Sequence, residues 1–217
     1  DNCGVARLFL FQGQEWGGVA KCQELIMTLV QNWQGESAAK MHRSPVKLHV
    51  TKLQENWNNS ELGFVQFVGE EPVEYHVVHK GAREWRCVAQ ADEQTMDVLQ
   101  ELCGWKPKGW ATAVGAKVLL GDFEVTCMHM QESNLGHGVT PGLILETRYS
   151  ASSNARMAMP RLEGLLSKLG ELWELKAGQF EHAELPMVKD PEEPYTSAQR
   201  AAQYYHASRC LVRASKH

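Results

Sequence analysis

Residues 117–125 read Lys117-Val-Leu-Leu-Gly121-Asp122-Phe123-Glu-Val125, and apolar and polar side chains continue to alternate as far as Met128. A Gly-Asp pair between two β-type runs is typical of a two-residue hairpin turn, because glycine readily adopts the positive φ that such turns need. We therefore predict two antiparallel strands joined at Gly121-Asp122. The rest of the chain can be placed around this hairpin.

Other β-type runs lie on both sides of the hairpin. They cover residues 5–11, 46–51, 62–68, 73–79 and 84–90 before it and residues 143–149 after it. Runs that follow one another directly are joined by connections too short for a parallel crossover, which takes a dozen or more residues. The sequence therefore predicts a largely antiparallel sheet.

Helical periodicity interrupts the β-type runs. Apolar residues recur at helical spacing over residues 19–33, 96–103 and 162–173. A capping-box pattern at Thr196 and Gln199 begins a terminal helix. The stripe of that helix consists of Ala198, Ala201, Tyr205, Ser208 and Val212. This order predicts an α+β fold, a largely antiparallel β-barrel or strongly curved sheet flanked by two long amphipathic helices and a C-terminal helix.

We expect a single domain whose last helix follows an exposed connection. The chain has 217 residues, of which 43% are hydrophobic and 22% charged, as in an ordinary globular domain. Residues 1–176 are predicted to form the barrel-like α+β domain and 177–195 an acidic, proline-rich connection. Residues 196–217 are predicted to form a C-terminal helix that packs on the same domain.

Charge and composition exclude several classes of protein. The net charge is −4 and the pI about 6.2, so the basic excess expected of a nucleic-acid-binding protein is absent. Basic and aromatic residues interleave at Trp105–Trp110, which we interpret as a solvated loop because two lysines neutralise too few phosphates. Six cysteines are too sparse for a disulfide scaffold. The apolar runs are far shorter than the ~20 residues of a membrane-spanning helix.

No catalytic, cofactor or metal motif is found in the sequence. His76 and His79 lie three residues apart on a predicted strand, so they point to opposite faces and cannot share a metal ion. His129 and His137 are interpreted as turn and edge residues. The first strand, residues 5–11, lacks the alternating Glu-x-Glu-x-Lys of triphosphate-tunnel enzymes. We therefore expect no enzyme activity, no cofactor and no metal.

Charged and histidine residues on the predicted strands leave an alternative function open. His49, Glu74, Glu124 and Arg148 lie on predicted strands and would face the interior of a barrel if they do not face solvent. A polar interior would make the chain a barrel enzyme acting on a small phosphorylated or organic substrate. An interior filled by Leu, Val and Phe would exclude this alternative.

Several stretches together resemble a known family. Gly4-Val5 opens the first strand, and Gly142-Leu-Ile-Leu-Glu146-Thr-Arg-Tyr149 runs into a leucine-rich helix. With the hairpin of residues 117–125 and the terminal Ala201-Ala202-Gln203-Tyr204-Tyr205, this pattern is similar to subunit 20 of the Mediator complex, the TRF-proximal protein family. The resemblance covers nearly the whole chain as architecture and is dense over residues 117–175 and 198–212.

The resemblance implies a fold, a location and partners. Members of this family look like β-barrels with flanking helices, and they are non-enzymatic subunits of the Mediator head module. The chain would then be a transcription coregulator that acts with RNA polymerase II in the nucleus. It would form a heterodimer with Mediator subunit 18, near the C-terminal helix of Mediator subunit 8. The resemblance implies no direct contact with nucleic acid or membrane.

The terminal helix carries the predicted partner interface. Tyr204, Tyr205 and Val212 are the residues that we expect to contribute to it. A helix of about 17 residues is marginal alone in water, so it must gain stability by packing. We expect it to dock on the barrel with Tyr205 as the main anchor and with Arg200 exposed.

Overall fold

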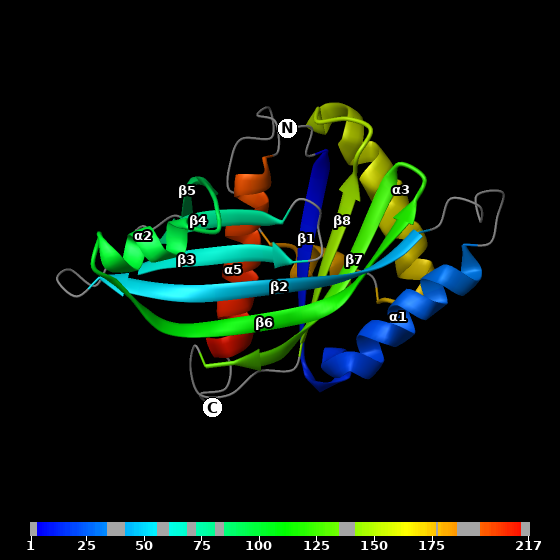
Figure 1. The fold of residues 1–217 in the computed structure, drawn as a ribbon. Coiled ribbons are helices and arrows are strands. Elements are labelled where there is room, and N and C mark those ends of the chain that lie inside the picture. The colour runs from blue at the N-terminus through cyan, green and yellow to red at the C-terminus, as the bar shows by residue number, and fades with distance from the viewer. Residues whose placement is uncertain are drawn as a thin grey trace.

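The computed structural model describes most of the chain. The described residues are 4–33, 42–55, 61–68, 73–80, 85–134, 142–176, 178–185 and 196–213. Eight strands form one sheet in the order β1-β8-β7-β6-β2-β3-β4-β5, with every neighbouring pair antiparallel. The strands are β1 (Val5–Gln12), β2 (His42–Glu55), β3 (Glu61–Val68), β4 (Glu74–Lys80), β5 (Trp85–Ala91), β6 (Trp105–Leu120), β7 (Phe123–Ser133) and β8 (Gly142–Tyr149). The sheet curves strongly into a half-barrel (Figure 1), which confirms the predicted fold class.

The predicted hairpin is confirmed as the connection between β6 and β7. Leu120 pairs with Phe123, and Gly121 between them has a φ of +66°, which glycine adopts without steric cost. However, β6 begins at Trp105, so the interpretation of Trp105–Trp110 as a solvated loop is wrong. The strand is long because β2 extends to Glu55 and continues to pair with it. Pro107 is accommodated next to a register shift, where a missing N–H is tolerated.

One face of the sheet is covered by two long helices, α1 (Gly18–Asn32) and α3 (Ala155–Leu172), at the right of Figure 1. A 3-10 turn, η1 (Gln14–Trp16), leads into α1. The indole of Trp173, just after α3, donates a hydrogen bond to the carbonyl oxygen of Leu25 at 3.1 Å. The core between these helices and the sheet includes Phe9, Phe11, Ile26, Leu29, Val118, Val125, Leu143, Leu145, Leu165 and Leu169.

The opposite, concave face is occupied by the terminal helix, α5 (Ser197–Arg213). This helix contacts β1 and β5, the two edge strands of the sheet, and also β3, β4 and β7. It therefore runs across the opening of the half-barrel, behind β2 and β3 in Figure 1. The core on this side includes Leu8, Val50, Val65, Phe67, Met128, Ile144, Tyr204, Tyr205 and Leu211.

Two short helices complete the fold. Helix α2 (Thr95–Glu101) connects β5 to β6, and α4 (Gln179–Ala183) follows α3. After α4, the backbone N–H of Leu185 donates to the carbonyl oxygen of Leu8 at 2.8 Å, and Arg7 bonds the carboxylate of Glu184. The described part of the predicted exposed connection, residues 178–185, thus packs along β1, and residues 186–195 lie outside the described chain.

Candidate functional site

Alternation along β8 sends charged side chains towards α5. Ile144 belongs to the core on the concave face, whereas Leu143 and Leu145 belong to the core beneath α1 and α3. Glu146 and Arg148 share the face of Ile144, because alternate residues of a strand point the same way. Glu146 is only 2% exposed, so it needs partners inside the fold.

Helix α5 supplies the partners of Glu146. The guanidinium of Arg200 donates through Nε to Oε1 at 2.8 Å and through Nη2 to Oε2 at 3.0 Å. The hydroxyl of Tyr204 donates to Oε2 at 2.7 Å. Burial raises the pKa of Glu146, but the charges of Arg200 and Arg148 and these hydrogen bonds lower it below its ordinary value overall. The carboxylate is therefore ionised at neutral pH.

Further charged groups lie beside Glu146 on the sheet. Arg148 donates to Oε2 of Glu124, and the ammonium nitrogen of Lys117 lies 3.7 Å from the same oxygen. The charges of Glu146 and Glu124 raise the pKa of Arg148 despite its burial. We call Lys117, Glu124, Glu146, Arg148 and Arg200 the interior charged cluster.

A second carboxylate, Glu61 of β3, bonds the middle of α5. The hydroxyl of Tyr205 donates to Oε1 of Glu61 at 2.9 Å, and Nη1 of Arg209 lies 3.4 Å from that oxygen. On the sheet side, the ammonium of Lys52 lies 2.9 Å from Oε2. Burial raises the pKa of Glu61, but Lys52, Arg209 and Tyr205 together hold it below its ordinary value. Two sheet carboxylates, Glu146 and Glu61, thus each bind two side chains of α5.

The predicted interface residues lie on this helix. Tyr204 and Tyr205 are both 0% exposed and face the sheet of their own chain. Val212 belongs to α5, but its side chain lies outside the described residues. A role of these residues in partner binding stays a prediction.

Arg200 is the clearest departure from the sequence-based expectation. It was expected on the surface, but it is 2% exposed and its guanidinium lies 4.3 Å from the centre of the Phe67 ring. The curved sheet surrounds α5, so even the polar side of this helix is buried. The sequence-based prediction treated the helix in isolation. It therefore did not anticipate that Glu146 of β8 would pair with Arg200.

The residues of the enzyme alternative are only partly brought together. Glu124 and Arg148 meet in the interior charged cluster. Glu74 bonds Nε2 of His76 at 3.3 Å, and this hydrogen bond, with the charges of Arg200 and Arg148, holds the pKa of Glu74 below its ordinary value. His49 bonds the hydroxyl of Thr112 at 3.0 Å and lies apart from them.

The charges in and beside the interior charged cluster are balanced among the described residues. Three cations, Lys117, Arg148 and Arg200, accompany three carboxylates, Glu74, Glu124 and Glu146. Within the described parts of the chain, no three His, Cys, Asp or Glu side chains are grouped as metal ligands would be. The ion pair of Glu146 with Arg200 can hold α5 in place. The positively charged groups of the cluster become accessible to a phosphate only if α5 moves.

Two other features were missed or misplaced by sequence reasoning. His129 was interpreted as a turn or edge residue, but it lies inside β7 and is 5% exposed; His137 is outside the described residues.

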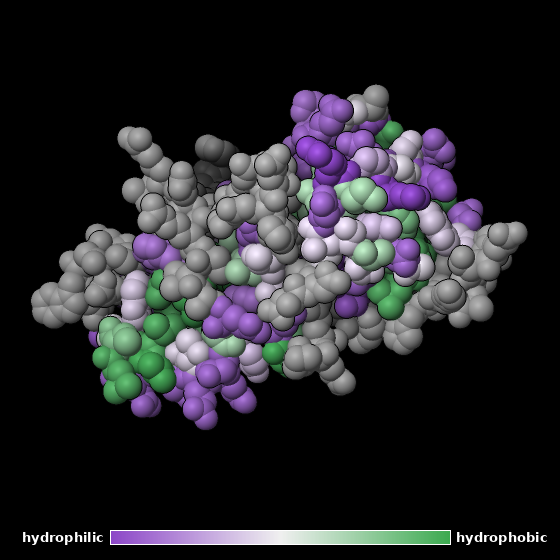
Figure 2. Space-filling view, turned by 90° about the horizontal axis from the view of Figure 1, so that it is seen from above, coloured by the Kyte–Doolittle hydropathy of each residue, from purple (hydrophilic) through white to green (hydrophobic). Residues whose placement is uncertain are grey.

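On the surface, Figure 2 shows apolar atoms gathered at the end of the molecule where α2 lies. Val98 of α2 and Leu102, which follows it, are 46% and 80% exposed. None of the helices in the described ranges is long and apolar enough to span a membrane.

Comparison with known proteins gives matches of architecture. No family model and no curated protein matches the chain. A chain of the Schizosaccharomyces pombe Mediator head module is similar at 12% identity and a TM-score of 0.41, covering 78% of this chain and 93% of its own. A Vibrio parahaemolyticus protein, provisionally described as an adenylate cyclase, is similar at 9% identity and a TM-score of 0.45, covering 91% and 99%. An RNA triphosphatase of S. pombe is similar at 9% identity and a TM-score of 0.37, covering 88% and 85%.

These likenesses concern the fold and identify neither an activity nor a partner. They correct one expectation nevertheless. The absence of motifs led us to expect that the chain is not an enzyme, yet similar structures include proteins described as enzymes. The expectation is therefore contradicted. It rested on the absence of contiguous motifs, and groups that are scattered in the sequence can converge in the fold without leaving such a motif.

Proposed function

We propose that this chain is a protein-binding subunit of the Mediator head module, similar to subunit 20, and acts with RNA polymerase II in the nucleus as a transcription coregulator. In this proposal it forms a stable heterodimer with Mediator subunit 18, near the C-terminal helix of Mediator subunit 8. The sequence pattern of residues 117–175 and 198–212 supports the assignment.

The observation that carries the proposal is the position of α5. The helix fills the concave face with Tyr204, Tyr205 and Leu211, which are all 0% exposed. The ion pair between Arg200 and Glu146 fixes it there at distances of 2.8 and 3.0 Å. A half-barrel filled by its own helix presents its outer surface, rather than its interior, to other molecules.

The proposal is tested by co-expression with the Mediator subunit 18 of the same organism, followed by size-exclusion chromatography. We expect a single peak that contains both proteins at micromolar concentration, and separate elution would contradict the proposed function. Because Tyr204 and Tyr205 stabilise the chain itself, the predicted interface is tested at Val212. We expect Val212→Glu to weaken co-elution. Unchanged co-elution would remove Val212 from the interface.

A second candidate function is a barrel enzyme acting on a small phosphorylated or organic substrate. It is favoured by the interior charged cluster, because Lys117 and Arg148 would be accessible to a phosphate if α5 left the concave face. The test measures phosphate and pyrophosphate release from ATP and tripolyphosphate, with Mg²⁺ or Mn²⁺ present. Turnover that is lost in Arg148→Met but kept in Lys21→Met, a change on α1, would support the enzyme.

A further inference from the structure

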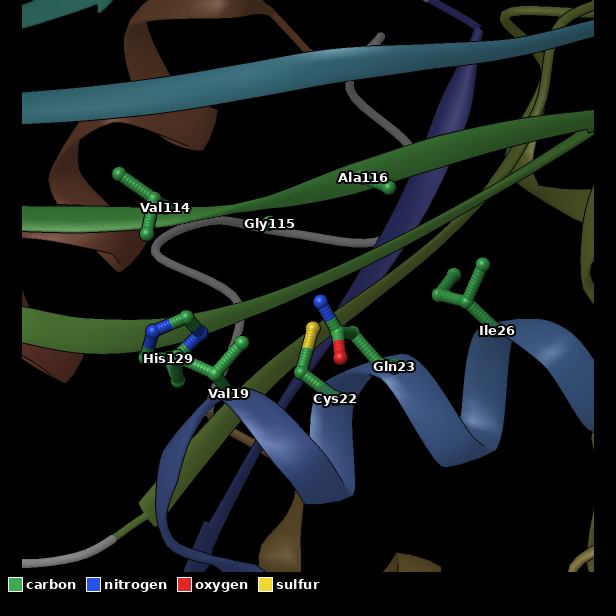
Figure 3. Close-up of a pocket in the computed structure, with 8 residues that line it drawn as sticks. All are labelled: Val19, Cys22, Gln23, Ile26, Val114, Gly115, Ala116 and His129. Carbon is green, nitrogen blue, oxygen red and sulfur yellow. The ribbon is translucent and has the colours of Figure 1, made fainter.

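A cleft of about 170 Å³ lies between α1 and the strands β6 and β7, on the side of the sheet opposite α5. Helix α1 lines it with Val19, Cys22, Gln23 and Ile26, β6 with residues 114–116, and β7 with His129 (Figure 3). The lining contains one histidine and no aspartate, glutamate, lysine or arginine. Within this lining, His129 is therefore the group that gains a charge in weakly acidic solution.

The ring of His129 is sealed beneath the start of α1. Both Nδ1 and Nε2 are buried, and neither has a hydrogen-bond partner among the described residues. Buried polar atoms without a partner are rare in folded proteins, because losing water without a replacement is unfavourable. A neutral ring tolerates this position at some cost, whereas a charged ring there would cost far more.

The neighbours of the ring do not compensate a positive charge. Directly opposite His129 in the sheet are Val114 on β6 and Leu143 on β8. On α1, the thiol of Cys22 already donates to the carbonyl oxygen of Cys127 at 3.2 Å. Burial raises the pKa of the Cys127 thiol well above its ordinary value, so this thiol remains uncharged in weak acid. None of these neighbours offers a carboxylate to a protonated histidine.

The burial of His129 couples its protonation to the packing of α1. Burial lowers the pKa of His129 below its ordinary value of 6.5, and no charge among the described residues opposes this effect. The charged residues of α1, Lys21 and Glu24, bond each other at 2.8 Å. A ring exposed to water takes up a proton near pH 6.5, whereas the sealed ring does so only at lower pH. A state that exposes the ring is therefore favoured increasingly as the pH falls below about 6.5.

Two glycines provide a hinge at the start of α1. Gly17 and Gly18 separate η1 from the rest of α1, and Gly18 has a φ of +90°, a conformation that favours glycine. Before the hinge, Trp16 is 7% exposed, and its ring stacks on Phe11 with the ring centres 4.5 Å apart. A rotation at the two glycines would lift the start of α1 from His129 while η1 stays in place.

We propose that His129 makes the packing of α1 pH-sensitive: protonation of its ring in weakly acidic solution opens the start of α1 away from β6 and β7. The protonated ring carries two N–H donors, and it reaches acceptors in water only when the helix lifts. Opening exposes the apolar side of α1 at Cys22 and Ile26, which are 4% and 1% exposed in the closed state. The inference concerns regulation and does not depend on either proposed function.

The inference is tested by hydrogen exchange of the full chain, measured by mass spectrometry between pH 7.5 and 5.5 and corrected for the intrinsic effect of pH on exchange. We expect the opening of α1 to increase by up to about tenfold, the factor by which a group that is protonated only in the open state, with a pKa of about 6.5, shifts the equilibrium. Exchange of α3 over the same range is the internal control and should change less than about twofold. Opening of α1 that does not change with pH would overturn the inference.

Substitutions assign the effect to His129. His129→Gln is polar but cannot be protonated, and His129→Leu also removes the buried atoms without a partner. We expect the opening of α1 to be independent of pH in both variants, and His182→Gln on α4 to behave like the wild type. In the unmodified chain, the NMR signals of the His129 ring and of the α1 amides should change with the same midpoint. A pH response that persists in the His129 variants, or different midpoints, would overturn the inference.

Discussion

The ring of Tyr205 occupies the space in which a side chain at residue 63 would begin. A Cβ built on Gly63 would lie 2.5 Å from Cε2 of Tyr205, closer than any Cβ contact that proteins tolerate. Gly63 is in the middle of β3, where glycine weakens a strand unless another group approaches its backbone. Here the approaching group is the main aromatic side chain of α5, so the glycine and the tyrosine act as a pair.

Replacing Gly63 by alanine should therefore loosen α5. We expect Gly63→Ala to lower the free energy of unfolding by about 1–3 kcal/mol, because the tightly packed ring must shift. The matched control is Gly164→Ala on the exposed side of α3, where a new Cβ meets nothing within 4 Å. That change should raise stability by about 0.5–1 kcal/mol, since alanine favours helix. Urea unfolding measures both, and equal effects would contradict the pairing.

The contributions of the ring and of the hydroxyl of Tyr205 to stability can be measured separately. Tyr205→Ala removes a fully buried ring and should cost about 3–5 kcal/mol. Tyr205→Phe keeps the ring and removes only the hydrogen bond to Glu61, so it should cost about 1 kcal/mol. Chemical denaturation distinguishes the two. Comparable losses in both variants would mean that the hydroxyl, rather than packing of the ring, anchors the helix.

Replacing Arg200 should destabilise the chain far more than the sequence-based expectation of an exposed arginine suggested. An exposed arginine would cost under about 0.5 kcal/mol on replacement by alanine. Because Arg200→Ala removes the bidentate guanidinium partner of the buried carboxylate of Glu146, we expect a loss of about 3–5 kcal/mol instead. The double change Arg200→Met with Glu146→Gln should recover part of that loss, since Gln is neutral and can still accept from Tyr204. No recovery in urea unfolding would contradict a charge-based penalty.

The sequence predicted the architecture better than the site, and the reason is physical. The Gly121-Asp122 hairpin and the helical stripes depend on local spacing, so the order of strands and helices could be derived from them. The pairing of Glu146 with Arg200 joins residues 54 positions apart, and it depends on how strongly the sheet curves around α5. Alternation on β8 indicates which face Glu146 shares but not which helix covers that face.

His129 shows the same limitation for the cleft. A single histidine near the end of an alternating run gives no local signal of burial. Its burial depends on the packing of α1 on β6 and β7, which brings Val19 and Cys22 beside it. The apolar spacing of residues 19–33 predicted that α1 packs on the sheet, but it could not predict which wall residues leave a gap.

Acid should weaken the contact between α5 and β3. The pKa of Glu61 in the folded chain lies below its ordinary value of 4.5. Its stabilisation is therefore fully present above about pH 4.5 and is lost as the pH falls through the folded-state value. Glu61→Gln should be less stable than the wild type at pH 7, and the difference should shrink below pH 4.5. Urea unfolding at several pH values measures it, and a constant difference would contradict the role of the charge.

Cysteine reactivity should report whether the core beneath α1 is as closely packed as the structure describes. Cys103 is exposed, whereas Cys22 and Cys127 are buried. Burial, followed by the proximity of Cys22, raises the pKa of the Cys127 thiol well above its ordinary value, so little of the reactive thiolate is present. We expect iodoacetamide at pH 8 to modify Cys103 at least about 100-fold faster than Cys127, because Cys127 reacts only when the core opens. Peptide mass spectrometry resolves each cysteine, and 8 M urea should remove the difference; similar rates in the folded chain would mean that α1 does not seal this side of the sheet.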